Sequence, residues 1–314
     1  DRYLGPDWFL ASRKPEMIKR IEEIYDEELW RGHETNRSRL LRTCRRRLVR
    51  QYEQRNAPRK VLEAVESALD QDTLTIAFAR RFATYKRAGL LLKDPERLES
   101  IINNTKYPVQ FIFAGKAHPK DNEGKELIKK IFQFANKAEV RDKIVFLEDY
   151  DMHLARHLLQ GADAWLNTPR RPLEACGTSG MKAAINGVLN VSILDGWWCE
   201  GYSEDRGWRI GNGEEYEDHG YQDTVESQAL YNVLENEVIP CFYDRKNGNL
   251  PACWLQKMKA SMKMAMKSFC SLRMVSDYEK RYYIPAARCQ DALLAEKAEK
   301  AKRLAAQSNR LRTL

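Results

Sequence analysis

Short β-rich segments alternate with helical segments through the middle of the chain, and this alternation limits the possible folds more than any other feature. The β-rich segments lie at 74–78, 109–113, 144–147, 164–166 and 188–194, with helical patterns at 85–92, 124–138 and 152–159. This order predicts a parallel sheet with helices on both faces, because parallel strands are joined by long crossovers that are usually helical. We therefore expect an α/β fold.

The segments on either side of this core are predicted to be helical. Helices are expected at 15–30 and 35–55, and the chain becomes helical again after about Ser227. The stretch 291–305 is rich in Ala, Lys, Glu and Leu, which is typical of an amphipathic helix or a frayed tail. The expected parts are a helical lead-in (1–70), the α/β core (71–226) and a helical extension (227–314).

The chain has 314 residues and a formal net charge of +8, and much of the positive charge lies between Arg37 and Lys60. Leucines interleave with these arginines at helical spacing and aromatic residues do not, so the solvated face of a helix is favoured over a nucleic-acid site. The sequence has no long apolar run, and its first residues do not resemble a signal peptide. We expect no membrane partner and a cytoplasmic location.

The seven cysteines are scattered, and none stands in a C-x-x-C pair. An odd number without paired spacing argues against a zinc site and against a disulfide framework. Reduced cysteines and no bound metal are therefore expected.

A cluster of four cations directly follows the first predicted strand. Arg80, Arg81, Lys86 and Arg87 lie within eight positions, at a strand end and the start of a predicted helix. Cations beside the free N–H groups of a helix N-terminus suit an anion such as phosphate or a sugar phosphate. The alternative is a solvated basic turn. The position at the carboxyl end of a strand favours the anion site.

A glycine-rich segment at 174–182 follows the fourth predicted strand and reads Glu-Ala-Cys-Gly-Thr-Ser-Gly-Met-Lys. Gly177 and Gly180 allow close approach of the backbone to a ligand, and Thr178 adds a hydroxyl, which predicts a second phosphate cradle at a helix start. A capped glycine-rich turn is the alternative. Partial burial of Lys182 among small apolar neighbours would lower its pKa and suit a Schiff base, whereas its spacing alone favours an exposed lysine.

These two segments resemble the signatures of the α-glucan phosphorylases, glycosyltransferases that use pyridoxal phosphate. The family's lysine motif, E-A-S-G-T-x-x-M-K, is similar to 174–182 with Cys176 in place of Ser, and its basic motif, ending in Y-K-R, is similar to 80–87. Further family blocks occur in the expected order at 113–117 and 145–150, and the resemblance covers 1–283. Segments 167–170 and 194–198 are similar to the shorter bacterial and archaeal branch.

The resemblance implies a Rossmann-like fold that forms the C-terminal half of a two-domain GT-B glycosyltransferase. It also implies the residues that hold the cofactor. Lys182 would bind pyridoxal phosphate as an internal aldimine, and Gly177 and Thr178 would cradle its phosphate. Tyr150 would pack near the pyridoxal ring, and Arg80 would reinforce the positive field there.

The resemblance implies reversible phosphorolysis of an α-1,4-glucan, in which inorganic phosphate yields glucose 1-phosphate. Arg81 and Lys86 would hold the substrate phosphate, with Tyr85 nearby. Glu174 and Gly177 would contact the transferred glucosyl unit. An N-terminal phosphorylase domain would complete the cleft, so the chain alone is expected to lack full activity, and a homodimer is a further expectation.

Two other functions remain open from the sequence. A cofactor-free nucleotide-sugar glycosyltransferase, similar to glycogen or starch synthase, shares a basic site at a strand end but needs no cofactor lysine. A phosphorylase-like scaffold without activity is the second. The aromatic cluster formed by Trp197, Trp198, Tyr202 and Trp208 fits core packing better than a sugar-stacking platform.

Overall fold

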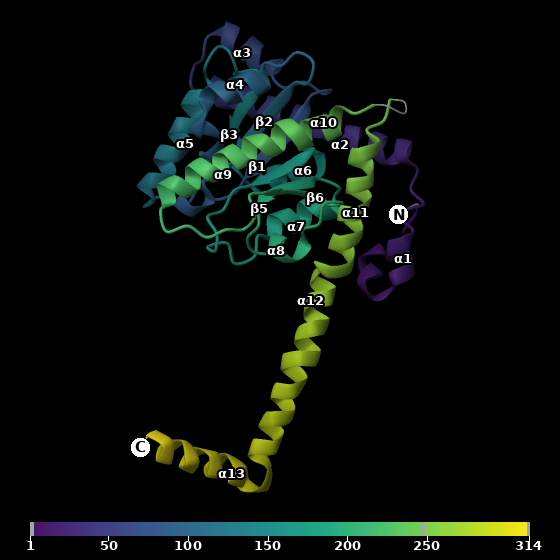
Figure 1. The fold of residues 1–314 in the computed structure, drawn as a ribbon, viewed down its shortest axis with the longest axis vertical. Coiled ribbons are helices and arrows are strands. Elements are labelled where there is room, and N and C mark those ends of the chain that lie inside the picture. The colour runs from purple at the N-terminus through teal and green to yellow at the C-terminus, as the bar shows by residue number, and fades with distance from the viewer. Residues whose placement is uncertain (1–2, 246–248, 313–314) are drawn as a thin grey trace.

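The protein is built around one six-stranded sheet, seen in the computed structural model that describes residues 3–245 and 249–312 (Figure 1). Every paired strand is parallel to its neighbour, and the strand order is β3-β2-β1-β4-β5-β6. The strands are β1 (Leu74–Ala79), β2 (Val109–Ala114), β3 (Ile144–Leu147), β4 (Ala164–Asn167), β5 (Leu189–Ile193) and β6 (Gly207–Ile210). The predicted α/β class is confirmed, and the short edge strand β6 is an addition to it.

Successive side chains of the strands point to opposite faces, and each face has its own set of helices. Ile76 and Phe111 belong to one core, whereas their neighbours Ala77 and Ile112 belong to the other. The first face is covered by α4 (Pro95–Ile102), α5 (Asn122–Ala135), α9 (His219–Val233), α10 (Ile239–Tyr243) and α11 (Ala252–Ser268). The second face is covered by α2 (Asp26–Glu53), α3 (Arg59–Glu66), α6 (Met152–Gly161) and α7 (Thr178–Ile185).

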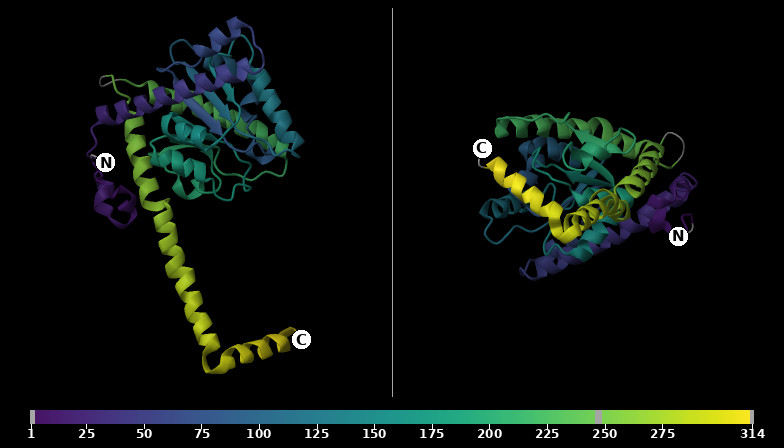
Figure 2. Two further views of the ribbon diagram at one scale, coloured as in Figure 1. Left: turned by 180° about the vertical axis from the view of Figure 1, so that it is seen from behind. Right: turned by 90° about the horizontal axis from the view of Figure 1, so that it is seen from below.

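Most of the basic run of the lead-in lies on α2, and its end, Arg59 and Lys60, starts α3. In the left view of Figure 2, α2 crosses the face of the sheet that is turned toward the viewer. The leucines of the run are buried as the helical spacing predicted, but Arg37 is buried as well and Arg45 is partly buried. Arg37 is only 2% exposed and donates to Asp163 at 2.8 Å. Arg45 donates to the carbonyl oxygens of Ala68 and Leu69. The prediction of a wholly solvated face is therefore wrong at these positions, where the guanidinium groups join α2 to the core.

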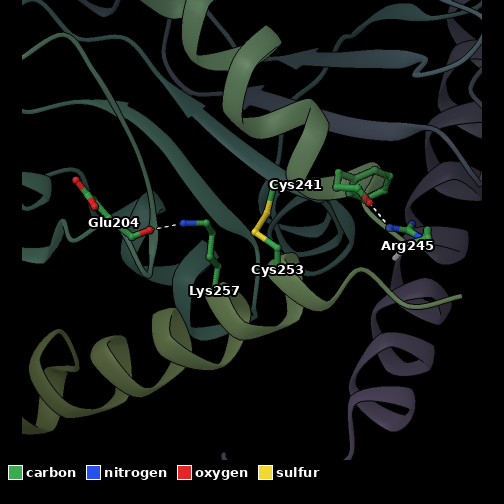
Figure 3. The surroundings of a disulfide bond; sticks show 6 residues. Glu204, Cys241, Arg245, Cys253 and Lys257 are labelled. Carbon is green, nitrogen blue, oxygen red and sulfur yellow. Dashed lines mark hydrogen bonds between the residues drawn. A yellow bond between two sulfur atoms is a disulfide. The ribbon is translucent and has the colours of Figure 1, made fainter. Parts of the chain in front are cut away.

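The expectation that all cysteines are reduced is also wrong. Cys241 of α10 and Cys253 of α11 form a disulfide whose Cα atoms are 5.7 Å apart (Figure 3). The two cysteines lie twelve positions apart, outside any spacing that marks a pair in a sequence. The remaining five cysteines are free. Among the described residues, no group of three or more His, Cys, Asp or Glu side chains is arranged to hold a metal.

The aromatic cluster packs in the core, as expected. Trp197, Trp198 and Trp208 are each at most 3% exposed. The indole N–H of Trp198, in the short helix α8 (Trp198–Gly201), donates to the carbonyl of Trp208 at 3.2 Å. These rings fix the edge of the sheet near α7.

The last helices leave the body of the molecule. α12 (Ser271–Tyr278) continues through the helical turn η5 (Glu279–Tyr283) into α13 (Ile284–Arg312), and both figures show this arm projecting beyond the sheet (Figures 1 and 2). A break at Ala295–Ala298 changes its direction. The helix predicted at 291–305 is thus present with an interruption. No helix in the described part of the chain is both long enough and apolar enough to cross a membrane.

Candidate functional site

The central strands β1 and β4 bring the two predicted phosphate segments to the same edge of the sheet. The strands are adjacent and parallel, with Ile76 opposite Ala164, so the loops that follow them leave from the same side. The strand order reverses between β1 and β4, and ligands of parallel sheets bind at the carboxyl ends beside such a reversal. The segments 80–87 and 168–182 meet there.

Glu174 is the centre of the contacts between these segments. Its carboxylate accepts hydrogen bonds from Arg80 Nη2 at 2.8 and 3.0 Å, and it also binds Lys86 Nζ. Arg80 additionally donates to the side-chain oxygen of Asn167, at the end of β4. Glu174 is 5% exposed, so its charge is buried together with the two cations that neutralise it.

The backbone after β1 differs from the predicted helix at 85–92. It forms two short turns, η2 (Thr84–Lys86) and η3 (Leu90–Lys93), separated by Arg87 in the left-handed conformation with φ 47°. The turn folds Lys86 inward over the ring of Tyr85, with 4.3 Å between Nζ and the ring centroid. The positive charge of the loop after β1 therefore comes from its side chains. The expected helix N-terminus after β1 is absent from this described loop.

Asp195 holds the backbone of the Glu174 segment and was not among the predicted site residues. Its carboxylate accepts from Glu174 N at 2.9 Å and from Gly196 N at 2.9 Å. Burial raises the pKa of Asp195, while these backbone hydrogen bonds oppose that rise. A carboxylate just beyond β5, at the strand's carboxyl end, was the signal in the sequence that could have identified it.

The two glycines of the lysine motif are required for different structural reasons. Gly177 precedes α7 with φ 88°, and a Cβ there would come within 3.2 Å of Glu174 Oε1. Gly180 lies inside α7, where a Cβ would come within 2.6 Å of the Asn190 side chain and 2.7 Å of the Trp197 ring. Gly177 thus provides the turn, and Gly180 allows α7 to pack closely against β5.

The N-terminus of α7 lies beside the Glu174 cluster, as the distance from Gly177 shows. Among the described residues, no side chain caps this helix. The first N–H groups of a helix have no partner within it, so they are available to an anion. Thr178, the first residue of α7, is exposed.

Lys182 stands one turn after Thr178, on the same side of α7. Its side chain is exposed, as its spacing alone favoured and contrary to the alternative of partial burial, and it forms no ion pair or hydrogen bond through that side chain with the described residues. Both residues line a hollow of about 550 Å³, whose remaining wall is mostly apolar and includes Met181, Met266 and Phe269. The hollow offers an apolar surface beside a free amine and a helix N-terminus.

The other predicted site residues, Arg81 and Tyr150, differ in their exposure and contacts. Arg81 is exposed and forms no ion pair or hydrogen bond through its side chain with the described residues. Tyr150 is partly buried, and burial raises its pKa, while the charge of nearby Arg80 opposes the rise. Neither Tyr150 nor Arg80 lines the hollow that contains Lys182. The structure thus brings Arg80, Lys86 and Glu174 into direct contact, whereas the side chains of Arg81 and Lys182 pair with no residue that the structure describes.

The sequence is similar to known proteins across most of its length. A family model described as carbohydrate phosphorylase matches residues 9–205. A glycogen phosphorylase of Aquifex aeolicus is 46% identical over 283 residues, which are 90% of this chain and 40% of that protein. A maltodextrin phosphorylase of Thermococcus litoralis is 44% identical over 91% of this chain and 33% of its own length. A glycogen phosphorylase of Mycobacterium tuberculosis is 42% identical over 88% of this chain and 32% of its own length.

The chain therefore spans a third to two-fifths of the length of these relatives. The matched region contains strands β1 to β5 and the two segments that meet at Glu174, and it ends just before β6. On this match, the chain belongs to the carbohydrate phosphorylase family, in the bacterial and archaeal branch of its glucan phosphorylases.

Proposed function

We propose that this chain is the cofactor-binding part of an α-1,4-glucan phosphorylase, which transfers a glucosyl unit between a glucan and inorganic phosphate. The observation that carries the proposal is the meeting of Arg80, Lys86 and Glu174 beside the N-terminus of α7, with free Lys182 one turn further on. A phosphorylase has to bring phosphate groups and a sugar together at one place. Clustered cations, a helix N-terminus and a carboxylate supply the groups for that task.

The residues around Lys182 fit pyridoxal phosphate. A free amine can bind the aldehyde, the uncapped start of α7 at Gly177 and Thr178 can accept the phosphate, and the apolar wall of the hollow can cover a ring. When bound, the cofactor supplies a phosphate group that acts as a proton donor or charge partner for the substrate phosphate. Arg80 and Tyr150 would contribute from the neighbouring loop ends.

The substrate phosphate would be held by cations of the first loop. Arg81 is exposed and unpaired among the described residues, so its guanidinium group can bind two phosphate oxygens without first breaking a contact. Lys86 is buried against Glu174 and sits over Tyr85, so it adds charge at a fixed position. Glu174 would accept hydrogen bonds from hydroxyl groups of the glucosyl unit, with Gly177 leaving room for the sugar.

The remaining parts of the proposal concern the whole protein. An N-terminal phosphorylase domain with a GT-B arrangement would complete the cleft, and the chain alone would lack full activity. Maltodextrin or glycogen would be the glucan, since relatives carry these names. A homodimer, a cytoplasmic location, and the division into lead-in, core and extension stay predictions.

The direct test is incubation with pyridoxal phosphate, followed by borohydride reduction and peptide mapping. The wild type should carry a pyridoxyl group on Lys182, and Lys182→Ala should lose it. Lys130→Ala, which removes another exposed lysine, is the matched control and should keep the label.

The alternatives give different results in this test. A cofactor-free transferase would carry no label and would bind a nucleotide-sugar instead. A scaffold domain would stay inactive even after the N-terminal half of a close relative is added. A label that persists in Lys182→Ala would place the cofactor on another lysine and would contradict the site assignment.

A further inference from the structure

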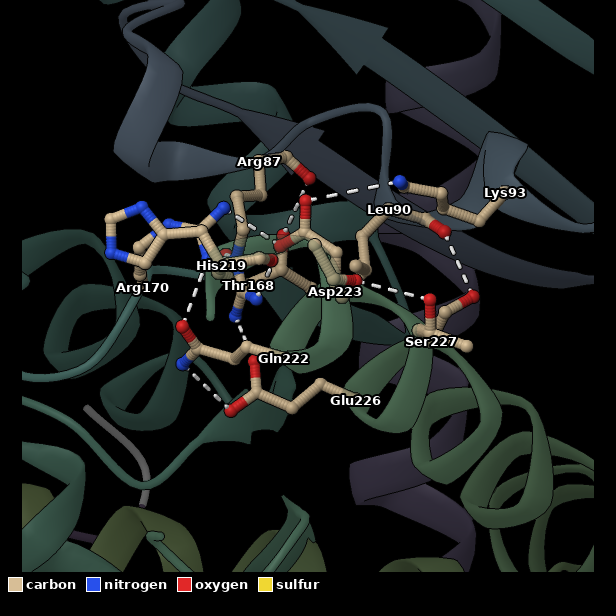
Figure 4. A network of polar contacts seen from close by, with 12 residues as sticks. Arg87, Leu90, Lys93, Thr168, Arg170, His219, Gln222, Asp223, Glu226 and Ser227 are labelled. Carbon is tan, nitrogen blue, oxygen red and sulfur yellow. Dashed lines mark hydrogen bonds and ion pairs between the residues drawn. The ribbon is translucent and has the colours of Figure 1, made fainter. Parts of the chain in front are cut away.

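A largely buried cluster of charged side chains joins α9 to the loops after β1 and β4 (Figure 4). Arg87 comes from the loop after β1, Arg170 comes from the loop after β4, and Asp223 and Glu226 come from the first two turns of α9. Arg87 belongs to the cation cluster that the sequence predicted to hold an anion, but it pairs here with Asp223 and Glu226. The other three residues were not among the predicted site residues. Burial of several charges costs free energy unless they are well paired, so the role of this cluster requires an explanation.

Arg87 joins the loop after β1 to the loop after β4 and to α9. It donates from Nε to Thr168 O at 3.1 Å and from Nη2 to Pro169 O at 2.7 Å. It also donates from Nη1 to Asp223 Oδ1 at 3.0 Å and forms an ion pair with Glu226. Arg87 directly follows Lys86 in the chain, so its guanidinium group fixes the backbone that carries Lys86.

Arg170 makes the corresponding links from the second loop. Its backbone N–H donates to Tyr85 O at 2.7 Å. Its guanidinium group donates to Gln222 Oε1 at 2.9 Å and to Asp223 Oδ1 at 2.8 Å. Arg170 precedes Glu174 by four residues, so it fixes the start of the segment that carries Glu174.

One oxygen atom, Oδ1 of Asp223, thus accepts from both arginines. We propose that Asp223 is a positioning residue, which acts through Arg87 and Arg170 to set the distance between Lys86 and Glu174 and thereby the affinity of the site for phosphate. Glu226 alone cannot replace it, because the guanidinium group of Arg170 donates to Gln222 and Asp223 and forms no ion pair with Glu226 within the described residues. The identity of the ligand as phosphate rests on the proposed function, whereas the coupling of the two loops rests on the observed contacts.

The test compares Asp223→Asn with Glu235→Gln. Asn removes the charge at nearly constant volume. Glu235 is the matched control because it lies just after α9 and binds an arginine of α4, Arg97, with two hydrogen bonds at 2.9 and 2.6 Å. Two quantities are measured on each folded chain, namely hydrogen–deuterium exchange of segments 80–93 and 168–176, and the dissociation constant for inorganic phosphate by calorimetry.

We expect Asp223→Asn to increase exchange in both segments together and to weaken phosphate binding about tenfold, as loss of one charged hydrogen bond predicts. Asp223→Glu, which keeps the charge, should recover most of both effects. Glu235→Gln should change neither, even if it lowers the melting temperature. If Asp223→Asn does not fold, Arg170→Lys tests the same link, because it keeps the charge and loses the fork that reaches Asp223.

Unchanged exchange and unchanged phosphate affinity in Asp223→Asn would overturn the proposal, and so would equal effects in Glu235→Gln. A wild type that binds no phosphate, but whose two segments still loosen together in Asp223→Asn, would support the coupling and contradict the proposed function. The two failures are therefore distinguishable.

Discussion

At each end of strand β4, one carboxylate accepts from two nitrogen-bearing side chains. Asp163, immediately before β4, binds His33 Nε2 at 2.7 Å and Arg37 Nη1 at 2.8 Å. Glu174, in the loop after β4, binds Arg80 and Lys86. The two clusters use similar groups on opposite edges of the same sheet.

The clusters differ in their access to solvent and in what surrounds them. The side chains of Asp163 and Arg37 are 0% and 2% exposed, and the second oxygen of Asp163 accepts from Thr75 N at 2.8 Å. Around Glu174, the side chains of Arg80 and Lys86 are 13% and 10% exposed. A closed cluster at the amino ends of the strands can only hold elements together, whereas a partly open one at the carboxyl ends can exchange partners with a ligand.

The largest expected effect is at the closed cluster. Asp163→Asn should lower the free energy of unfolding by about 3–5 kcal/mol, because it leaves Arg37 buried without a counter-charge. Urea denaturation at neutral pH measures this loss. Asp142→Asn, at an exposed position, is the control and should stay within about 0.5 kcal/mol of wild type.

The pH dependence of stability checks the same cluster. Burial alone would raise the pKa of Asp163, but Arg37 and His33 outweigh burial and hold the pKa below its usual value. A depressed pKa stabilises the fold above the pKa of the unfolded chain, and this contribution is lost as the pH falls below about 4. The stability gap between wild type and Asp163→Asn should therefore narrow in acid. A gap that widens would show that the carboxylate does not contribute as a charge.

A smaller effect is expected at the open cluster. Glu174→Gln should cost about 1–2 kcal/mol of stability, because Arg80 and Lys86 can turn toward solvent once the carboxylate is gone. Removal of one negative charge should at the same time tighten the binding of inorganic phosphate. Calorimetry of phosphate binding and urea denaturation on one preparation separate these changes. A loss as large as that of Asp163→Asn would remove the distinction between the two clusters.

Arg81 should matter for ligand binding and hardly at all for folding. Arg81→Ala is expected to change the free energy of unfolding by less than about 0.5 kcal/mol, since the side chain is exposed and unpaired among the described residues. High phosphate concentration should raise the melting temperature of wild type by mass action and should raise that of the variant less. Equal shifts in both proteins would exclude Arg81 from the phosphate site.

The smallest effect is expected in thiol reactivity, which also distinguishes the closed interior of the protein from the open surface near the candidate site. Burial raises the pKa of Cys44, on α2, to about 12, so its thiol should stay unreactive in the native protein. Cys176, beside Lys182 on the wall of the hollow, is exposed and should react readily. Cys241 and Cys253 should react only after reduction. Mapping of labelled peptides distinguishes these classes, and protection of Cys176 by pyridoxal phosphate would support the cofactor site.

The sequence was sufficient to predict five of the six described strands, because strand patterns are local signals. Glycine-rich and basic motifs are also local, and they marked the two segments that meet at Glu174. The partners of these segments were not predictable in the same way. Asp195 and Asp223 act through contacts with residues 21 and more than 50 positions away. The disulfide and the burial of Arg37 likewise depend on how α10, α11 and α2 pack, which no local pattern specifies.

The buried pair of Asp163 and Arg37 has a consequence for how the molecule opens. The two residues are 126 positions apart, so their contact forms only when α2 closes a long loop onto the assembled sheet. If α2 moved away alone, the buried carboxylate of Asp163 would lose its counter-charge. Local opening of α2 without the sheet is therefore energetically costly. We expect α2 and the central strands to exchange their amide hydrogens as one cooperative unit, with the arm formed by α12 and α13 exchanging long before them.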